Sequence, residues 1–133
     1  MKQIKKVFAL LLALCFLAVI PLTAAADVEN GSQIVGTWTG YLDYDAATGN
    51  VKNITISDSS LMLFANGTGV WLWQGKTYDI KWSFKEKDED GFWFNFDAGN
   101  NVYMNLNFNP EGQSAGLLML FSIDHGIVIY KKL

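Results

Sequence analysis

Few residues of this chain belong to the types that carry out chemistry. His125 is the single histidine, and it lies between Asp124 and Gly126 in a predicted turn, where a solvated side chain is expected rather than a general base. Cys15 is the only cysteine and lies near the N-terminus, so the rest of the chain offers no thiol that could pair with His125. The sequence therefore predicts no catalytic residue and a protein that is not an enzyme.

Two acidic stretches are the nearest approach to a metal site. Asp88-Glu89-Asp90-Gly91 is similar to part of a calcium-binding loop but lacks the remaining ligands and the closing glutamate. Asp43, Asp45 and Asn50 would bind a cation only weakly. Most acidic residues fall in predicted turns or on outward faces, where paired carboxyl groups with raised pKa values are not expected. We therefore predict no metal and no cofactor.

Residues 1–26 have the composition of a secretory signal peptide. Three lysines precede an apolar run, and a proline and small residues follow it: Lys2, Lys5, Lys6, then Val7 to Ile20, Pro21, and Thr23 to Ala26. This run is shorter than the about 20 residues of a membrane anchor. A lipoprotein is the other alternative, but Leu14, not a small residue, precedes Cys15. We expect cleavage before Asp27 and a secreted, periplasmic or cell-envelope protein without a membrane anchor.

Charge and cysteine content limit the partners of the predicted mature chain, residues 27–133. The chain has no arginine, and its formal net charge goes from −3 to −6 once the three leader lysines are removed. An acidic domain repels phosphate backbones and anionic lipid headgroups, which excludes nucleic acid as a partner. Without cysteine, a single domain of this length must be stabilised by its apolar core alone.

Alternation of apolar and polar residues predicts strands throughout residues 27–133 and no helix after Ala26. Gly, Asn, Asp and Pro separate the strands and favour hairpins. Closure would remove the exposed edges of such a meander. We predict an all-β fold, an antiparallel up-and-down meander of eight or nine strands closed into a small barrel and preceded by a signal-peptide helix. The expected strands are Ile34–Tyr44, Val51–Ser57, Leu61–Ala65, Gly69–Gln74, Thr77–Lys85, Phe92–Asp97, Val102–Phe108, Ala115–Ile123 and Ile127–Lys132.

The alternation also indicates which side chains face the inside of this barrel. They are aromatic or apolar, and they would contact a small apolar molecule held in the interior. The predicted ligand-binding residues are Tyr78, Ile80, Trp82, Phe84, Phe94, Met104 and Leu106, with Trp38 beside them.

The strand around Trp71 and Trp73 is apolar on both faces, because Val70 and Leu72 alternate with the tryptophans. One reading is that a loop, the N-terminal segment or a second subunit covers the outer face. The other reading is a contact surface for a protein or a glycan, formed by Trp71, Trp73 and Trp93.

Gly36-Thr37-Trp38 follows Ile34-Val35 on the first predicted strand, and the chain ends Tyr130-Lys131-Lys132-Leu133. This pairing resembles the calycin superfamily of lipocalins and avidins, most closely the small exported bacterial lipocalin-like domains. The resemblance implies a lipocalin-like or avidin-like barrel whose floor is closed by Gly36 and Trp38, with the cation of Lys132 or Lys131 packed over the indole ring. The chain lacks a Thr-Asp-Tyr motif, a helix before the last strand and avidin's polar contacts to biotin. Such a resemblance transfers a fold better than a ligand.

Two functions remain open from the sequence. The first is an exported, non-enzymatic barrel that binds a small hydrophobic ligand in its interior. The alternative is a filled barrel that acts as an inhibitor or as a protein or glycan interaction module through exposed tryptophans, with a protein partner or a second copy as in a homodimer.

Overall fold

The structure is a computed structural model that describes residues 31–99 and 104–133 of the 133-residue chain. The predicted leader, its helix and its cleavage site lie outside the described residues, as do the first two residues of the strand predicted from Val102. Within the described part, no helix has the length and apolar character needed to cross a membrane. The helical element found there is η1 (Ser32–Ile34), a single 3₁₀ turn.

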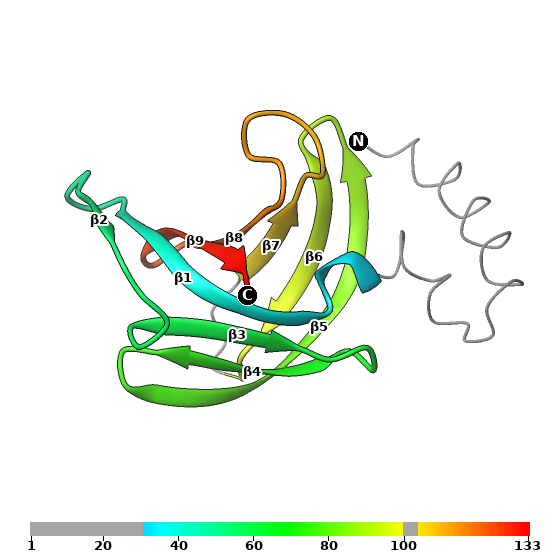
Figure 1. Cartoon of the computed structure of the whole chain (residues 1–133), viewed down its shortest axis with the longest axis horizontal. Helices are drawn as coiled ribbons and strands as arrows, with labels where there is room; N and C mark the ends of the chain where they lie inside the picture. The colour runs from blue at the N-terminus through cyan, green and yellow to red at the C-terminus, as the bar shows by residue number, and fades with distance from the viewer. Residues whose placement is uncertain (1–30, 100–103) are drawn as a thin grey trace, which may run out of the picture.

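All extended elements belong to one antiparallel sheet, and eight of its strands close into a barrel (Figure 1). The prediction of an all-β, closed, antiparallel meander is thus confirmed. The strands are β1 (Gly36–Asp45), β2 (Val51–Asn53), β3 (Ser59–Leu63), β4 (Thr68–Trp73), β5 (Lys76–Asp88), β6 (Gly91–Asp97), β7 (Met104–Phe108), β8 (Leu117–Ser122) and β9 (Gly126–Lys132).

The barrel is closed by the pairing of its first strand, β1, with its last strand, β9. From β3 to β9 each strand pairs with the next one in the sequence, and β9 returns to β1. In that last pairing Trp38 lies opposite Lys132 at one end of the barrel, and Asp45 lies opposite Gly126 at the other. The end with Trp38 is referred to below as the floor, and the end with Asp45 and Gly126 as the mouth.

A β-bulge in β1 changes which side chains face inward near the mouth. Gly40 lies opposite Tyr130, but the next pair joins Leu42 to Ile129, so that Tyr41 is the additional residue. A bulge of this kind reverses the alternation beyond it. Asp43 therefore lies opposite Val128 on the inner face and is only 7% exposed. Without the bulge, Leu42 would face inward instead.

β2 lies outside the closed ring. The first half of β1 pairs with β3, and residues 42–44 pair with β2. The sequence predicted one strand from Val51 to Ser57, but the strand ends at Asn53 because Thr55 turns the chain and donates its backbone N–H to Asp58 Oδ2 over 2.8 Å. Residues 54–58, named the strap, cross over Gly40, where a Cβ atom would lie 2.8 Å from Ile54 Cδ1.

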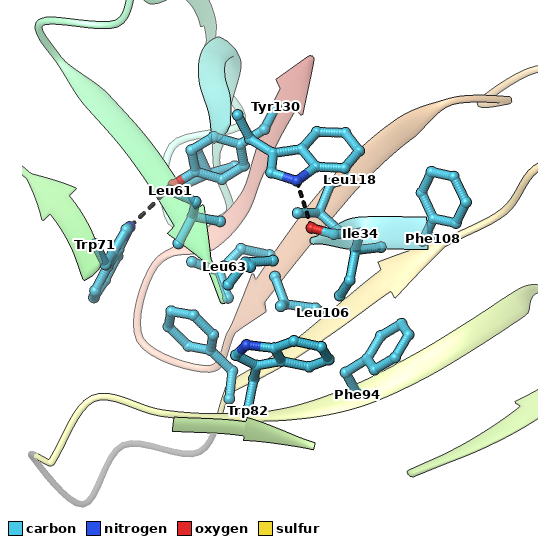
Figure 2. Close-up of a cluster of buried hydrophobic side chains, with 14 of the residues drawn as sticks. Ile34, Leu61, Leu63, Trp71, Trp82, Phe94, Leu106, Phe108, Leu118 and Tyr130 are labelled. Atoms are coloured by element: carbon cyan, nitrogen blue, oxygen red, sulfur yellow. Dashed lines mark hydrogen bonds between the residues drawn. The ribbon is translucent and has the colours of Figure 1, made fainter. Parts of the chain in front are cut away.

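Apolar side chains from η1 and from the strands form one buried cluster inside the barrel (Figure 2). Ile34 of η1 packs into it from the N-terminal side, and Trp82 meets Phe94 with ring centroids 5.8 Å apart. Side chains from six strands and η1 are at most 1% exposed: Ile34, Trp38, Leu61, Leu63, Phe94, Leu106, Leu118, Leu120 and Tyr130.

The residues predicted to line the interior all belong to this core or pack against it. Five are buried, namely Ile80, Trp82, Phe94, Met104 and Leu106, whereas Tyr78 and Phe84 are partly buried against them. Their inward orientation agrees with the alternation in the sequence. Their surroundings are other side chains, since aromatic pairs such as Phe84 and Phe94, 5.8 Å apart, occupy this space.

Candidate functional site at the barrel mouth

The floor is closed around Trp38. Its indole Nε1–H donates to the carbonyl of Ile34 over 2.8 Å, which ties η1 to β1. The ammonium of Lys132 lies 4.9 Å from the centroid of the Trp38 ring and donates to the Val35 carbonyl over 2.9 Å. Partial burial lowers the pKa of Lys132 below its usual value by desolvation. Gly36 has φ +133° and leaves room for Lys132, since a Cβ atom there would lie 2.9 Å from Lys132 Cε.

Lys131 has a different position from Lys132. Its ammonium lies 4.4 Å from the centroid of the Tyr41 ring on the outer face of the barrel. Of the two lysines that the resemblance left open, Lys132 is therefore the one over Trp38.

Trp71 and Trp73 lie on the inner face of β4, so of the two readings left open for this strand, the one that makes them an outer contact surface does not hold. Trp71 lies opposite Leu61 and Trp73 opposite Ser59, and Leu61 and Ser59 are both fully buried. Trp71 is 6% exposed, Trp73 is partly buried, and their rings stack with centroids 5.8 Å apart. The outer face of β4 is formed by Val70 and Leu72 instead. Both faces of this strand are apolar, so alternation alone did not decide between them.

A chain of hydrogen bonds below the mouth has a single possible direction. Trp71 Nε1–H donates to the Tyr130 hydroxyl over 3.0 Å, because an indole nitrogen is only a donor (Figure 2). Ser59 Oγ donates to the Leu72 carbonyl over 2.7 Å, because a carbonyl only accepts. The Tyr130 hydroxyl must then donate to Ser59 Oγ, 2.8 Å away. Every polar group in this buried chain is satisfied.

Tyr130 stays neutral in this position. Desolvation raises its pKa from 10.0 to about 12, the hydrogen bonds with Ser59 and Trp71 act in the opposite direction, and the charge of Asp43 adds a smaller increase. The neutral phenol keeps the proton that it donates to Ser59. The mouth is therefore supported from below by a fixed, uncharged network.

Asp43 and His125 meet at the mouth. His125 Nε2 lies 2.5 Å from Asp43 Oδ1, and the side chains are 27% and 8% exposed. The imidazole also meets the Trp73 ring edge to face, with centroids 5.2 Å apart. His125 does lie in the turn between β8 and β9, but the expectation of a fully solvated side chain is wrong. The two residues are 82 positions apart in the sequence, and Asp43 faces inward only because of the bulge.

A pocket of about 370 Å³ lies beside this pair, between the β1–β2 hairpin, the strap and the turn after β4. Asp43 and Trp73 are among the residues that line it, and most of the lining is polar. The lining residues are Asp43, Lys52, Asn53, Ile54, Ser57, Asp58, Trp73, Gln74 and Gly75. Volumes of this order are typical of small-molecule sites.

Trp93 lies on the outer face of β6, apart from the other two tryptophans that the sequence grouped with it. Its Nε1–H donates to Asp88 Oδ1 over 3.0 Å, and its ring lies 5.4 Å from that of Phe121. Asp88 Oδ1 also accepts the backbone N–H of Asp90, so this acidic stretch forms a turn. Across residues 31–99 and 104–133, no three His, Cys, Asp or Glu side chains are grouped as a metal site would need.

Sequence reasoning missed the residues that shape the mouth, which are Asp43, Ser59, His125 and Tyr130. It weighed Asp43 only as a weak cation ligand and His125 only as a solvated residue. Ser59 lies before the predicted strand Leu61–Ala65 in the polar run Ser57 to Ser60, so nothing in the sequence set it apart as a buried hydrogen-bond partner.

The closed antiparallel barrel is compatible with the lipocalin-like architecture that Gly36, Trp38 and the C-terminal lysines suggest. No family of proteins, no curated protein and no solved structure matches this chain in sequence or structure comparisons.

Proposed function

We propose that this chain is an exported, non-enzymatic binding protein that holds a small organic molecule in the pocket at the barrel mouth. The pocket of about 370 Å³ beside Asp43 and Trp73 carries this proposal. Its lining is mostly polar, with Trp73 and Ile54 as the apolar members, so hydrogen bonds and charge would orient the ligand. The hydrogen-bonded network of Trp71, Tyr130 and Ser59 supports the proposal because it fixes the inner wall before any ligand arrives.

The ligand is placed at the mouth instead of deeper in the barrel because of how the deeper residues pack. Trp82, Phe94 and Leu106 are at most 5% exposed and contact one another within the core. Opening a site among them would require separating packed aromatic rings, which costs several kcal/mol per large side chain displaced, at roughly 25 cal/mol per Å² exposed. The predicted interior residues therefore support the barrel, and the contacts to the ligand come from the rim.

The test uses tryptophan emission, because Trp73 lines the pocket and Trp93 lies outside the barrel. The processed protein is screened against a library of small metabolites, and hits are confirmed by isothermal titration calorimetry. We expect a saturable emission change that is lost in Trp73→Phe and kept in the matched control Trp93→Phe. A signal lost only in Trp93→Phe, or a library without any saturable response, would contradict the proposal.

A second candidate is contact with another protein through an apolar hollow on the outer face. This hollow of about 320 Å³ lies near the mouth end and is lined mainly by Tyr44, Phe121, Ile123 and Ile127, with Trp93 adjacent to Phe121. Ile123 is 79% exposed and, with Tyr44 and Phe121, contributes to a contiguous apolar patch. Replacement of Ile123 by Ser should then abolish self-association or capture of a partner in sedimentation experiments. If the wild-type protein sediments as a monomer and Ile123→Ser sediments in the same way, this candidate is removed.

A further inference from the structure

The charge arrangement in the mouth pocket selects a class of ligand, provided that the pocket is a binding site as proposed above. We propose that the ligand is a small organic cation, an ammonium group attached to an aromatic or apolar body. The ammonium would contact the carboxylate of Asp43, and the body would lie along the ring of Trp73.

Asp43 keeps one oxygen available to a ligand. Its carboxylate is 92% buried, and Oδ1 is used by His125. Within residues 31–99 and 104–133, no hydrogen bond or ion pair reaches Oδ2. A buried carboxylate oxygen without a donor is costly, and a charged donor is the partner that relieves this cost most strongly. An ammonium that enters the pocket supplies such a donor.

Lys52 does not fill this role, although it is the nearest cation in strand register. It lies directly opposite Asp43 in the β1–β2 pairing and lines the same pocket. In the part of the chain that the structure describes, however, the side chain that contacts the Asp43 carboxylate is His125 and not Lys52. The Lys52 side chain is exposed and keeps its ammonium in solvent, as long flexible lysines commonly do.

The remaining walls also favour a cation. Asp58 adds a second carboxylate to the lining, so Asp43 and Asp58 outnumber the single charge of Lys52. Trp73 adds an indole to the lining, and the negative potential of an indole ring attracts cations, although one face of this ring is covered by Trp71. The mature chain as a whole is acidic and attracts cations from solution.

The experiment compares three probes of one shape and different charge. Phenethylammonium, 2-phenylethanol and phenylacetate are titrated into the processed protein at pH 8 by calorimetry. We expect phenethylammonium to bind at least about tenfold more tightly than the neutral alcohol, and phenylacetate not to bind measurably. Raising the salt concentration should weaken only the binding of the cation.

Three variants identify the charged residue that selects the cationic probe. Asp43→Asn should weaken phenethylammonium by about tenfold, and Lys52→Gln should tighten it by roughly threefold, because removal of a nearby like charge lowers the repulsion. Asp79→Asn is the control, since Asp79 is an exposed carboxylate on β5 outside the pocket. Lys52→Gln keeps the test decisive if Asp43→Asn unfolds, because Lys52 is exposed on an outer hairpin.

The outcomes separate the two proposals. The cationic class would be overturned if all three probes bound equally or if phenylacetate bound more tightly. The pocket would remain a binding site if the emission change on binding were still lost in Trp73→Phe. Selective binding of phenethylammonium that is unaffected by both Asp43→Asn and Lys52→Gln would also overturn the inference. Failure of every probe and of the metabolite library would remove both the class and the site.

Discussion

The hydroxyl of Tyr130 donates to Ser59 Oγ over 2.8 Å, and the neighbours on both sides fix this direction. The indole of Trp71 can only donate to the phenol, and the serine must give its proton to the Leu72 carbonyl. The network joins β3, β4 and β9 across the inside of the barrel. It positions the ring of Trp71, which stacks on Trp73, and Trp73 in turn lines the pocket.

Removal of the Tyr130 hydroxyl should destabilise the protein. In Tyr130→Phe the indole N–H of Trp71 and one lone pair of Ser59 lose their partner in a buried site, which costs about 1–3 kcal/mol. Urea denaturation followed by tryptophan emission measures this loss. Tyr41→Phe is the matched control because Tyr41 lies on the outer face, and it should change stability by less than about 0.5 kcal/mol. Equal stability of the two variants would contradict the network.

Stability should fall above pH 10 because of the same residue. The pKa of Tyr130 is raised from 10.0 to about 12 in the folded chain, mainly by desolvation, so the native state keeps a proton that the unfolded state loses in this range. The stabilisation is present below pH 10 and disappears as the pH rises through 12, with a size of the order of 3 kcal/mol.

Urea midpoints between pH 9 and pH 12 measure this dependence, with Tyr130→Phe as the reference. Lys132 and the other lysines titrate in both proteins, so the difference between the two curves isolates Tyr130. We expect the wild-type advantage over Tyr130→Phe to shrink steadily above pH 10. Parallel curves over the whole range would show that Tyr130 does not titrate as proposed.

The two C-terminal lysines should differ sharply when each is replaced by methionine. Lys132→Met loses the hydrogen bond to Val35 and the ammonium over Trp38, which together contribute about 1–2 kcal/mol. Lys131→Met loses only a surface contact with Tyr41 and should cost less than about 0.5 kcal/mol. Thermal denaturation distinguishes the two variants. If Lys131→Met lost more stability than Lys132→Met, Lys131 and not Lys132 would be the lysine that closes the floor.

A methyl group at Gly40 should displace the strap. Its Cβ would lie 2.8 Å from Ile54 Cδ1 and 3.0 Å from the carbonyl oxygens of Thr55 and Ser59, and backbone atoms yield less easily than side-chain ends. We expect Gly40→Ala to cost about 1–3 kcal/mol by overpacking. Hydrogen exchange should also quicken at the amide of Ile54, which donates to the Tyr41 carbonyl over 3.0 Å. The neighbouring substitution Thr39→Ala is the control, and unchanged Ile54 protection in Gly40→Ala would refute the displacement.

The strand order followed from the sequence because its physical signals are local. Polar residues alternate with apolar ones from Thr77 to Lys85, and turn formers such as Asn66-Gly67 separate neighbouring strands. These signals act between residues that are close in the chain, and hairpins join such residues in space. The same reasoning placed Trp82, Phe94 and Leu106 on the inner face, where the structure has them.

The mouth depended on signals that a single sequence does not contain. The bulge at Tyr41 moves Asp43 to the inner face, and Gly40, which precedes it inside the strand, is its one local signal. The orientation of Trp71 depended on a partner hydroxyl 59 positions away, and that of His125 on a carboxylate 82 positions away. Long-range polar contacts of this kind become visible only when the barrel is closed.

Because β2 lies outside the closed ring, the strands that stabilise the barrel are different from the segments that surround its mouth. The hydrogen-bonded cylinder is complete without Val51–Asn53 and the strap, yet these segments form the outer side of the pocket. Exchange or lengthening of residues 46–53 would therefore reshape the entrance while the closed ring and the buried Ile54 stay in place. This hairpin is the natural place to engineer new selectivity into the protein.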